Sequence, residues 1–184
     1  MMRLLLIMLL LFGINGVLGQ GLYKPGDIAR GSLASYRYIA DHPEIDSSLM
    51  IIRNTSNVDT TDIMYYDDGS AVDFDWILTS ENQFTRADVA ALLKGMLTAS
   101  EREILSSRSS GCMEIWIVTD KAGNAIELEF LIDSDDPVFA RIDPDRLFLI
   151  ETKLKALLKI KISKEDSKIK NIKHVVGVDY DDFK

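Results

Sequence analysis

The stretch that decides the fold is residues 113–132, which read MEIWIVTDKAGNAIELEFLI. Two rows of apolar residues at every second position flank a short polar segment. The rows are Met113, Ile115 and Ile117, then Ile126, Leu128, Phe130 and Ile132. Between them stand Gly123 and Asn124, residue types that easily adopt the positive φ of a short hairpin connection. This pattern predicts an antiparallel hairpin with one buried face. It also predicts that three glutamates point towards water, namely Glu114, Glu127 and Glu129.

A helix is predicted after this hairpin. Asp143 is a typical N-cap residue, and Pro144 suits the first helical position because that position needs no N–H donor. Apolar residues then recur at spacings of three and four, which is typical of a helix with one buried face. They are Leu147, Ile150, Leu154, Leu157 and Leu158. We expect this apolar stripe to pack on the inner face of the hairpin.

The segments before the hairpin carry weaker signals. Residues 27–41 show weak helical spacing, closed by His42 and Pro43 because the residue before proline disfavours the α region. Residues 49–52 suit a strand. Residues 63–78 predict a second hairpin with Asp-Gly in its turn, and the two hairpins suggest one sheet.

Two threonines then mark helix starts. Thr85 and Thr98 each begin a capping-box pattern, which predicts two short helices meeting near Gly95. After the central helix, residues 169–178 suit a last strand, and the acidic tail 179–184 is expected to fray. Together these elements predict an α+β fold, an antiparallel sheet with helices packed on one face.

The first residues resemble a secretory signal peptide. Residues 1–19 contain Arg3, an apolar run over 4–12 and a small-residue cleavage site ending at Gly19. The apolar run is shorter than the roughly 20 residues that span a bilayer. We therefore expect a periplasmic or secreted protein without stable membrane insertion, consisting of one α+β domain over residues 20–184. Helices and a hairpin would form residues 20–111, and a ββαβ module residues 112–184.

The charge balance narrows the class of partner. Without residues 1–19 the chain keeps 20 basic and 29 acidic residues, a net charge of −9. Nucleic-acid binding requires basic residues that neutralise phosphates, so we expect no nucleic-acid partner.

The residues 115–124, followed by Ile126-Glu127-Leu128, the helix and Lys159-Ile160-Lys161-Ile162, resemble the strand–strand–helix–strand module of TonB C-terminal domains. Together with the leader, this module is also similar to small exported Bacteroidetes-type proteins of unknown function. TonB energy transducers keep a membrane anchor and a proline-rich spacer, whereas this chain has a cleavable leader and four prolines. The resemblance therefore implies a fold and a cell-envelope setting, without energy transduction.

Few residues suggest chemistry. Cys112 is the single cysteine, and we expect a buried thiol, with a reactive thiol or an intermolecular bridge as alternatives. A nucleophilic pair of Cys112 with His174 is conceivable, but only Arg108 supplies positive charge nearby. We assign no catalytic, cofactor-binding or metal-binding residue. Five acidic groups could supply oxygen ligands to calcium: Asp67/Asp68, Asp73/Asp75, Asp133/Asp135/Asp136, Asp143/Asp145 and Asp179/Asp181/Asp182.

Three surface features suggest binding. Lysines gather in the Lys153–Lys173 region of an otherwise acidic chain, which allows an anionic partner although lysines also favour a helix C-terminus. An aromatic set could form a sugar-binding platform or cross-strand core pairs: Tyr65, Tyr66, Phe74 and Trp76. Asn54-Thr55-Ser56 matches the N-glycosylation pattern, which has meaning only in a eukaryotic secretory cell.

The leading functional hypothesis is a non-catalytic, exported module that binds a protein or envelope component through its sheet edge or the basic region. The alternative is a small secreted hydrolase, calcium-dependent or not, that uses paired aspartates. A subunit of an envelope assembly is a third hypothesis.

Overall fold

The computed structural model describes residues 22–41, 48–58, 63–73, 75–108 and 111–184, so the signal-peptide prediction lies outside the described residues. Within these ranges six antiparallel strands form one sheet, in the order β1-β2-β3-β6-β5-β8. The strands are β1 (Ile28–Arg30), β2 (Ser35–Ala40), β3 (Leu49–Asn54), β5 (Cys112–Thr119), β6 (Ala125–Asp133) and β8 (Ile172–Asp179). Two short strands, β4 (Glu81–Asn82) and β7 (Ile160–Lys161), pair separately.

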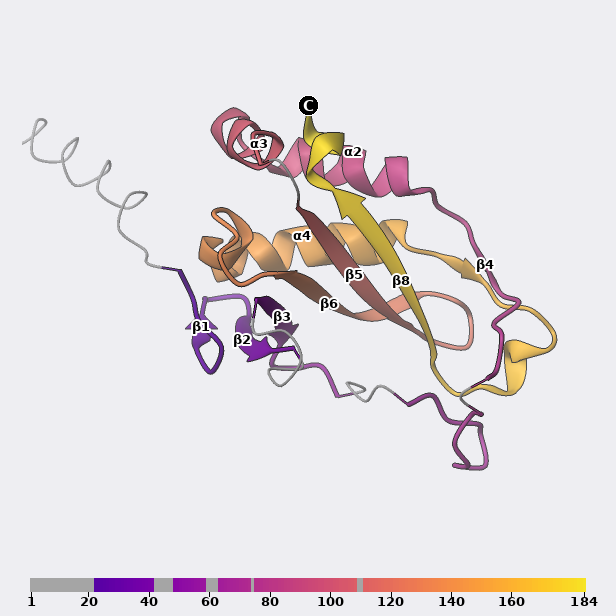
Figure 1. The fold of residues 1–184 in the computed structure, drawn as a ribbon. Coiled ribbons are helices and arrows are strands. Elements are labelled where there is room, and N and C mark those ends of the chain that lie inside the picture. Colours follow the sequence, from indigo (N-terminus) through magenta and orange to yellow (C-terminus); the bar gives the residue numbers. More distant parts are fainter. Residues whose placement is uncertain (1–21, 42–47, 59–62, 74, 109–110) are drawn as a thin grey trace, which may run out of the picture.

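Helices cover one face of the sheet (Figure 1). They are α2 (Arg86–Met96), α3 (Ala99–Ser106) and α4 (Pro144–Leu157), with 3-10 turns η1 (Phe139–Arg141), η2 (Asp166–Lys168) and η3 (Tyr180–Phe183). Capping boxes at Thr85 and Thr98 begin α2 and α3, and the Asp143 side chain accepts hydrogen bonds from the first turn of α4. These three starts confirm the sequence predictions, because each depends only on local chemistry.

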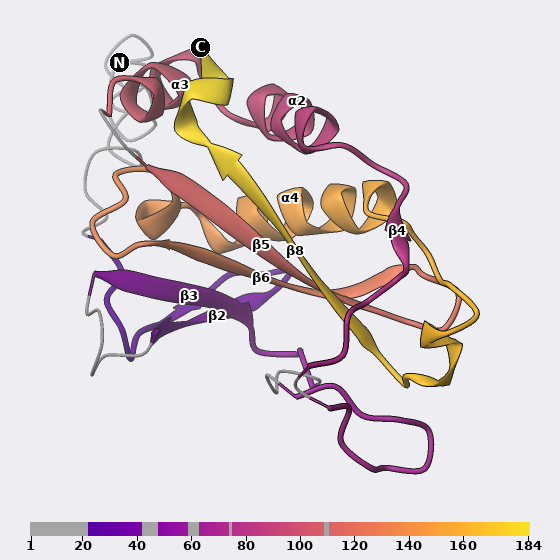
Figure 2. The ribbon, with the colours of Figure 1, turned by 45° about the vertical axis from the view of Figure 1, so that its right-hand side comes forward.

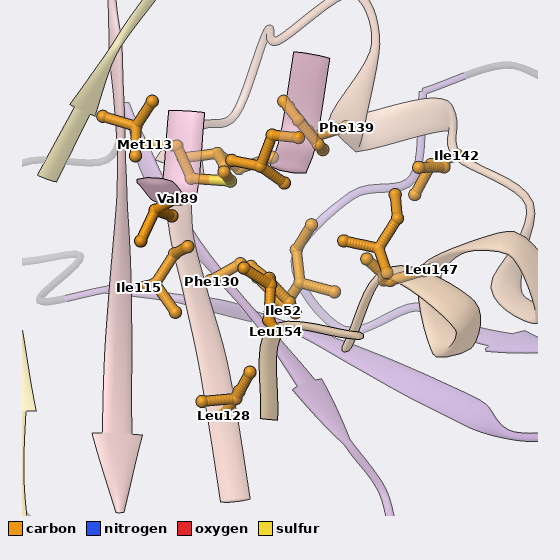
Figure 3. Close-up of a cluster of buried hydrophobic side chains, with 14 of the residues drawn as sticks. Ile52, Val89, Met113, Ile115, Leu128, Phe130, Phe139, Ile142, Leu147 and Leu154 are labelled. Carbon is orange, nitrogen blue, oxygen red and sulfur yellow. The ribbon is translucent and has the colours of Figure 1, made fainter. Parts of the chain in front are cut away.

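The core lies between α4, α2 and the covered face of the sheet. Figure 3 shows Leu154 of α4 against Ile52 and Phe130 of the sheet. Leu147, Ile150, Leu154 and Leu158 are buried as predicted, and Leu157 is partly buried. The central hairpin also has the predicted pairing, with Ile117 opposite Leu128. Its turn requires Gly123, whose φ is +79° and where an added Cβ would lie 1.8 Å from the carbonyl oxygen of Ile160.

The predicted helix over residues 27–41 is wrong. This segment forms β1 and β2, and Tyr36 and Tyr38 are buried in the core while Arg37 between them is exposed. That alternation is the period of a strand, and the aromatic residues favour it. The N-terminal part of the chain therefore extends the main sheet, where β3 pairs with β6.

The predicted second hairpin does not form a pair of strands. Among the described residues of 63–78, the two arms share one isolated bridge, Tyr65 to Ala71, around the turn at Gly69. This hairpin does not join the main sheet, and β1–β3 supply the additional strands instead.

The acidic tail does not fray. Tyr180 and Phe183 of η3 are buried in the main core, and the Tyr180 hydroxyl donates a hydrogen bond to the buried carboxylate of Asp136. Acidic composition suggested exposure, but the two aromatic side chains determine the conformation because they remove apolar area from water.

The uncovered face of the hairpin also differs from the prediction. Glu127 and Glu129 are buried: the backbone N–H of Val58 donates to Glu127, and the Arg53 guanidinium pairs with Glu129 across the strands. The strand register shifts where β6 begins, and Ile126 is 40% exposed instead of facing the core. Of the three glutamates predicted to point towards water, only Glu114 is even partly exposed.

Candidate functional site

Most of the aspartates that suggested calcium binding have structural partners. Asp143 caps α4, and Asp145 accepts hydrogen bonds from Ser32 and Leu33. Arg108 forms ion pairs with Asp133 and Asp135. Arg86 forms ion pairs with Asp179 and Asp182. Asp68 accepts a hydrogen bond from the Ser70 hydroxyl. Across the described ranges, no three His, Cys, Asp or Glu side chains come together in a way that would hold a metal ion. These acidic groups cap turns and position loops.

Asp166 accepts several hydrogen bonds from residues 76–80, and the sequence analysis missed it. It is fully buried, and it accepts hydrogen bonds from Trp76 Nε1 (2.9 Å), Thr79 N (2.9 Å) and Ser80 N (2.7 Å). Burial raises its pKa, but the hydrogen bonds from Ser80, Trp76 and Thr79 outweigh this effect and lower the pKa to about 2. Through these hydrogen bonds, Asp166 holds residues 76–80 against η2. No pattern around it in the sequence distinguishes it from a solvated aspartate.

Cys112 and His174 do not form a nucleophilic pair. Cys112 is exposed, which corrects the prediction of a buried thiol, and it lies opposite Asp179 at one end of β8. His174 pairs with Ile117, five residues further along β5, or about 17 Å at strand spacing. Burial, then Glu114 and Asp133, raise the pKa of the Cys112 thiol, whereas burial lowers the pKa of His174. The thiol thus lacks a base, and the acidifying effect of the Arg86 charge is smaller than the effects that raise the pKa.

The glycosylation pattern is not accessible. Asn54 is buried, and its Nδ2 donates to Glu151 Oε2 at 3.0 Å on the covered face of the sheet. Glycosylation requires an exposed asparagine, so Asn54 serves the core instead.

Several lysines of the Lys153–Lys173 region have internal partners. Lys155 pairs with Glu151, Lys159 donates to Asn124, and the ammonium of Lys168 lies 4.4 Å from the ring centre of Trp76. Lys161, Lys164 and Lys170 are exposed around η2 and the approach to β8. The basic surface therefore concentrates where β8 begins.

The aromatic residues proposed as a platform divide between two environments. Tyr66 and Trp76 meet edge to face with ring centres 6.3 Å apart, beside the small core cluster of Val72, Ile169 and Ile172. Tyr65 is exposed and lines a pocket of about 450 Å³, which Tyr66 also borders. Phe74 lies outside the described residues. The described aromatic residues therefore do not form a flat platform.

The strand β8 is an edge of the main sheet and lies alongside β5 (Figure 2). Tyr180 N donates to Gly111 O at 3.1 Å, directly beyond the Cys112–Asp179 pair. Hydrogen-bonded and non-hydrogen-bonded pairs alternate in an antiparallel ladder, so Val175 and Gly177 direct their N–H and C=O groups outward. Within the described part of the chain, no other backbone bonds to these groups. β8 thus presents an open edge, whereas the other edge, β1, has three residues.

Comparison with known proteins gives a likeness in fold. No protein-family model matches the chain, and no curated protein matches it significantly. The crystal structure of a DUF5043 family protein from Bacteroides uniformis is similar, with a TM-score of 0.69 and 18% sequence identity over 86% of this chain and 88% of that one. The two chains share an α+β fold. This likeness fits the expected resemblance to Bacteroidetes-type proteins of unknown function, but it does not confirm the resemblance to TonB domains.

Proposed function

We propose that this protein is an exported, non-catalytic binding module of the cell envelope, and that β8 binds an extended segment of a partner protein as an additional strand. The observation that carries the proposal is the outward direction of the backbone groups of Val175 and Gly177 on an eight-residue edge strand. Natural edges are usually blocked by shortness, proline, bulges or charge. β1 is short, but the stretch from Val175 to Val178 has none of these protections.

The side chains along this edge indicate the chemistry of the partner. Val175 is 55% exposed on the uncovered face, and Gly177 has nothing within 4 Å of the position of a Cβ, so a partner strand can approach closely. Exposed Lys164 and Lys170 precede β8. We therefore expect the partner segment to carry an apolar side chain beside Val175 and acidic residues near these lysines.

Among the residues the structure describes, no helix is both long and apolar enough to cross a bilayer. Export itself is tested by expressing the full chain in a Gram-negative host and sequencing the N-terminus of the product. Cleavage predicts a periplasmic or secreted chain that begins at Gln20. An intact Met1 in a cytoplasmic product would contradict export.

The edge is tested by selecting heptapeptides from a random displayed library against the chain beginning at Gln20. We expect enriched peptides to alternate apolar and polar residues and to carry acidic residues. The variant Val175→Pro removes an outward N–H and should abolish binding, while Val175→Lys should weaken it. Leu149→Lys changes an exposed apolar residue on α4 and should bind as the unmodified chain does.

Hydrogen exchange supplies the second readout. Bound peptide should slow exchange of the amides of Val175 and Gly177, because these amides become donors in a new ladder. Peptides that bind Val175→Pro equally well, or that leave both amides unprotected, would refute strand addition. The alternative hydrolase needs paired aspartates with a shared reacting point, whereas Asp143 is engaged in a helix cap and Asp135 and Asp182 are engaged in ion pairs.

A further inference from the structure

The pocket at the start of β6 includes neither Val175 nor Gly177 of the β8 edge, although Lys170, which precedes β8, lines it. Its frame is set by backbone pairing: Tyr66 bridges to Ile169, Lys170 N donates to Tyr65 O (2.8 Å) and Asp67 N donates to Lys168 O (3.0 Å). The register shift at the start of β6 brings Ile126 and Glu127 to the opposite wall. The resulting volume of about 450 Å³ lies within the range of small-molecule sites, about 300–1,000 Å³.

Exposed apolar side chains concentrate at this pocket. Val58, Ile63, Tyr65 and Ile126 all line it, with exposed fractions of 88, 50, 37 and 40%. Single exposed apolar residues are ordinary, but a group of them around one concavity is typical of a ligand site. The tyrosine adds a flat face with a polar hydroxyl at its end.

Polar groups lie among these apolar residues. Glu127, 8% exposed, accepts the backbone N–H of Val58 at 2.8 Å, which holds its carboxylate at the wall. Asp67, Lys170 and Asn171 complete the polar lining, and Lys121 pairs with Asp67. The charges of the wall therefore nearly cancel. A strongly charged ligand would meet a like charge, whereas a neutral ligand with several hydroxyl groups would find acceptors in the carboxylates and the amide.

We propose that this pocket binds a short neutral saccharide. The apolar face of a sugar ring would lie on Tyr65 and the neighbouring aliphatic side chains, and its hydroxyl groups would donate to Glu127 and hydrogen-bond to Asn171. The site would give the protein a carbohydrate-binding capacity separate from strand addition at β8.

To test the proposal, the chain beginning at Gln20 is titrated with four probes, and two-dimensional NMR monitors each titration. The probes are maltose, cellobiose, glucuronic acid and a short-chain alcohol. We expect saturable binding of a neutral disaccharide, with shifts confined to amides around Tyr65, Ile126 and Asn171. Tyr65→Ala should weaken binding about tenfold or more through the lost ring face. Asn171→Ala should also weaken it, and Ile77→Ala, an exposed residue that does not line the pocket, should have no effect.

Unchanged sugar affinity in Tyr65→Ala would overturn the proposal. Binding of the alcohol but of neither disaccharide would also overturn it, and so would the absence of binding by any neutral sugar. Glu127 is buried and its replacement risks misfolding, so exposed Tyr65 and partly exposed Asn171 carry the test. Val175→Pro should retain sugar binding, which separates failure at this pocket from failure at the β8 edge.

Discussion

The hydroxyl of Tyr36 on β2 donates a 2.5 Å hydrogen bond to the carboxylate of Glu151 on α4, 115 positions away. Asn54 donates to the same oxygen, and Lys155 pairs with the other. Burial and the nearby Glu151 charge raise the pKa of Tyr36, so the hydroxyl stays a donor at all ordinary pH values. This contact joins the N-terminal strands to the central helix.

Glu151→Ala should therefore lower the free energy of unfolding by about 3 kcal/mol, because it leaves the buried donors of Tyr36 and Asn54 without an acceptor. Urea unfolding at pH 7 measures this change. Exposed Lys153→Ala on the same helix should stay within about 0.5 kcal/mol of the unmodified chain. Equal stability of the two variants would mean that the buried contact contributes nothing.

Gly123→Ala should cost more than the usual penalty of a positive φ, about 1–3 kcal/mol, because the new methyl group would collide with Ile160 O. Gly69 has a φ of +86° and open space around it, so Gly69→Ala isolates the conformational part of the penalty. Thermal unfolding of both variants makes the comparison. A loss at Gly123 no larger than at Gly69 would show that the contact with Ile160 relaxes freely.

The pKa of Asp166, lowered to about 2, predicts a dependence of stability on pH. Its contribution is present above the ordinary aspartate pKa of 3.8 and is lost as the pH falls through the folded-state pKa of about 2. Asp166→Asn should thus be less stable than the unmodified chain at pH 6, and the difference should shrink between pH 4 and pH 2. Fluorescence of Trp76, which donates to Asp166, reports the local change. A difference that does not change with pH would contradict this role.

Removal of residues 180–184 should destabilise the fold by about 3–6 kcal/mol, since Tyr180 and Phe183 each lose a buried environment. Removal of Lys184 alone leaves both aromatic side chains in place and should cost less than about 1 kcal/mol. Guanidinium unfolding of the two truncations distinguishes an anchored tail from a frayed one. Equal unfolding midpoints for the two truncations would mean that the tail is frayed, as the sequence predicted.

Cys112 should react with a thiol reagent in the native state, because its side chain is exposed. Partial desolvation and nearby carboxylates raise the pKa of this thiol, so the labelling rate should be low at pH 7 and rise as the pH approaches and passes the ordinary thiol value of 9.0. Mass spectrometry follows the reaction. Cys112→Ser should abolish labelling, and labelling that requires denaturant would indicate a buried thiol.

Local chemistry in the sequence determined the central hairpin, the starts of α2, α3 and α4, and the leucines that α4 buries. Turn residues, caps and period-two or helical spacing act within a few positions, so they can be recognised without knowing the partner segments. The same patterns indicated an α+β fold. They also correctly placed the last strand near Val176.

Tertiary contacts decided the remaining features, because each depends on residues far apart in the chain. Tyr36 belongs to a strand since β2 pairs with β3 and α4 supplies Glu151, and Asn54 is buried for the same reason. The pocket joins residues near 65, 126 and 170, and the open edge of β8 exists because β5 occupies only its other side. Backbone pairing and burial are properties of the assembled sheet, and no local pattern encodes which edge stays exposed.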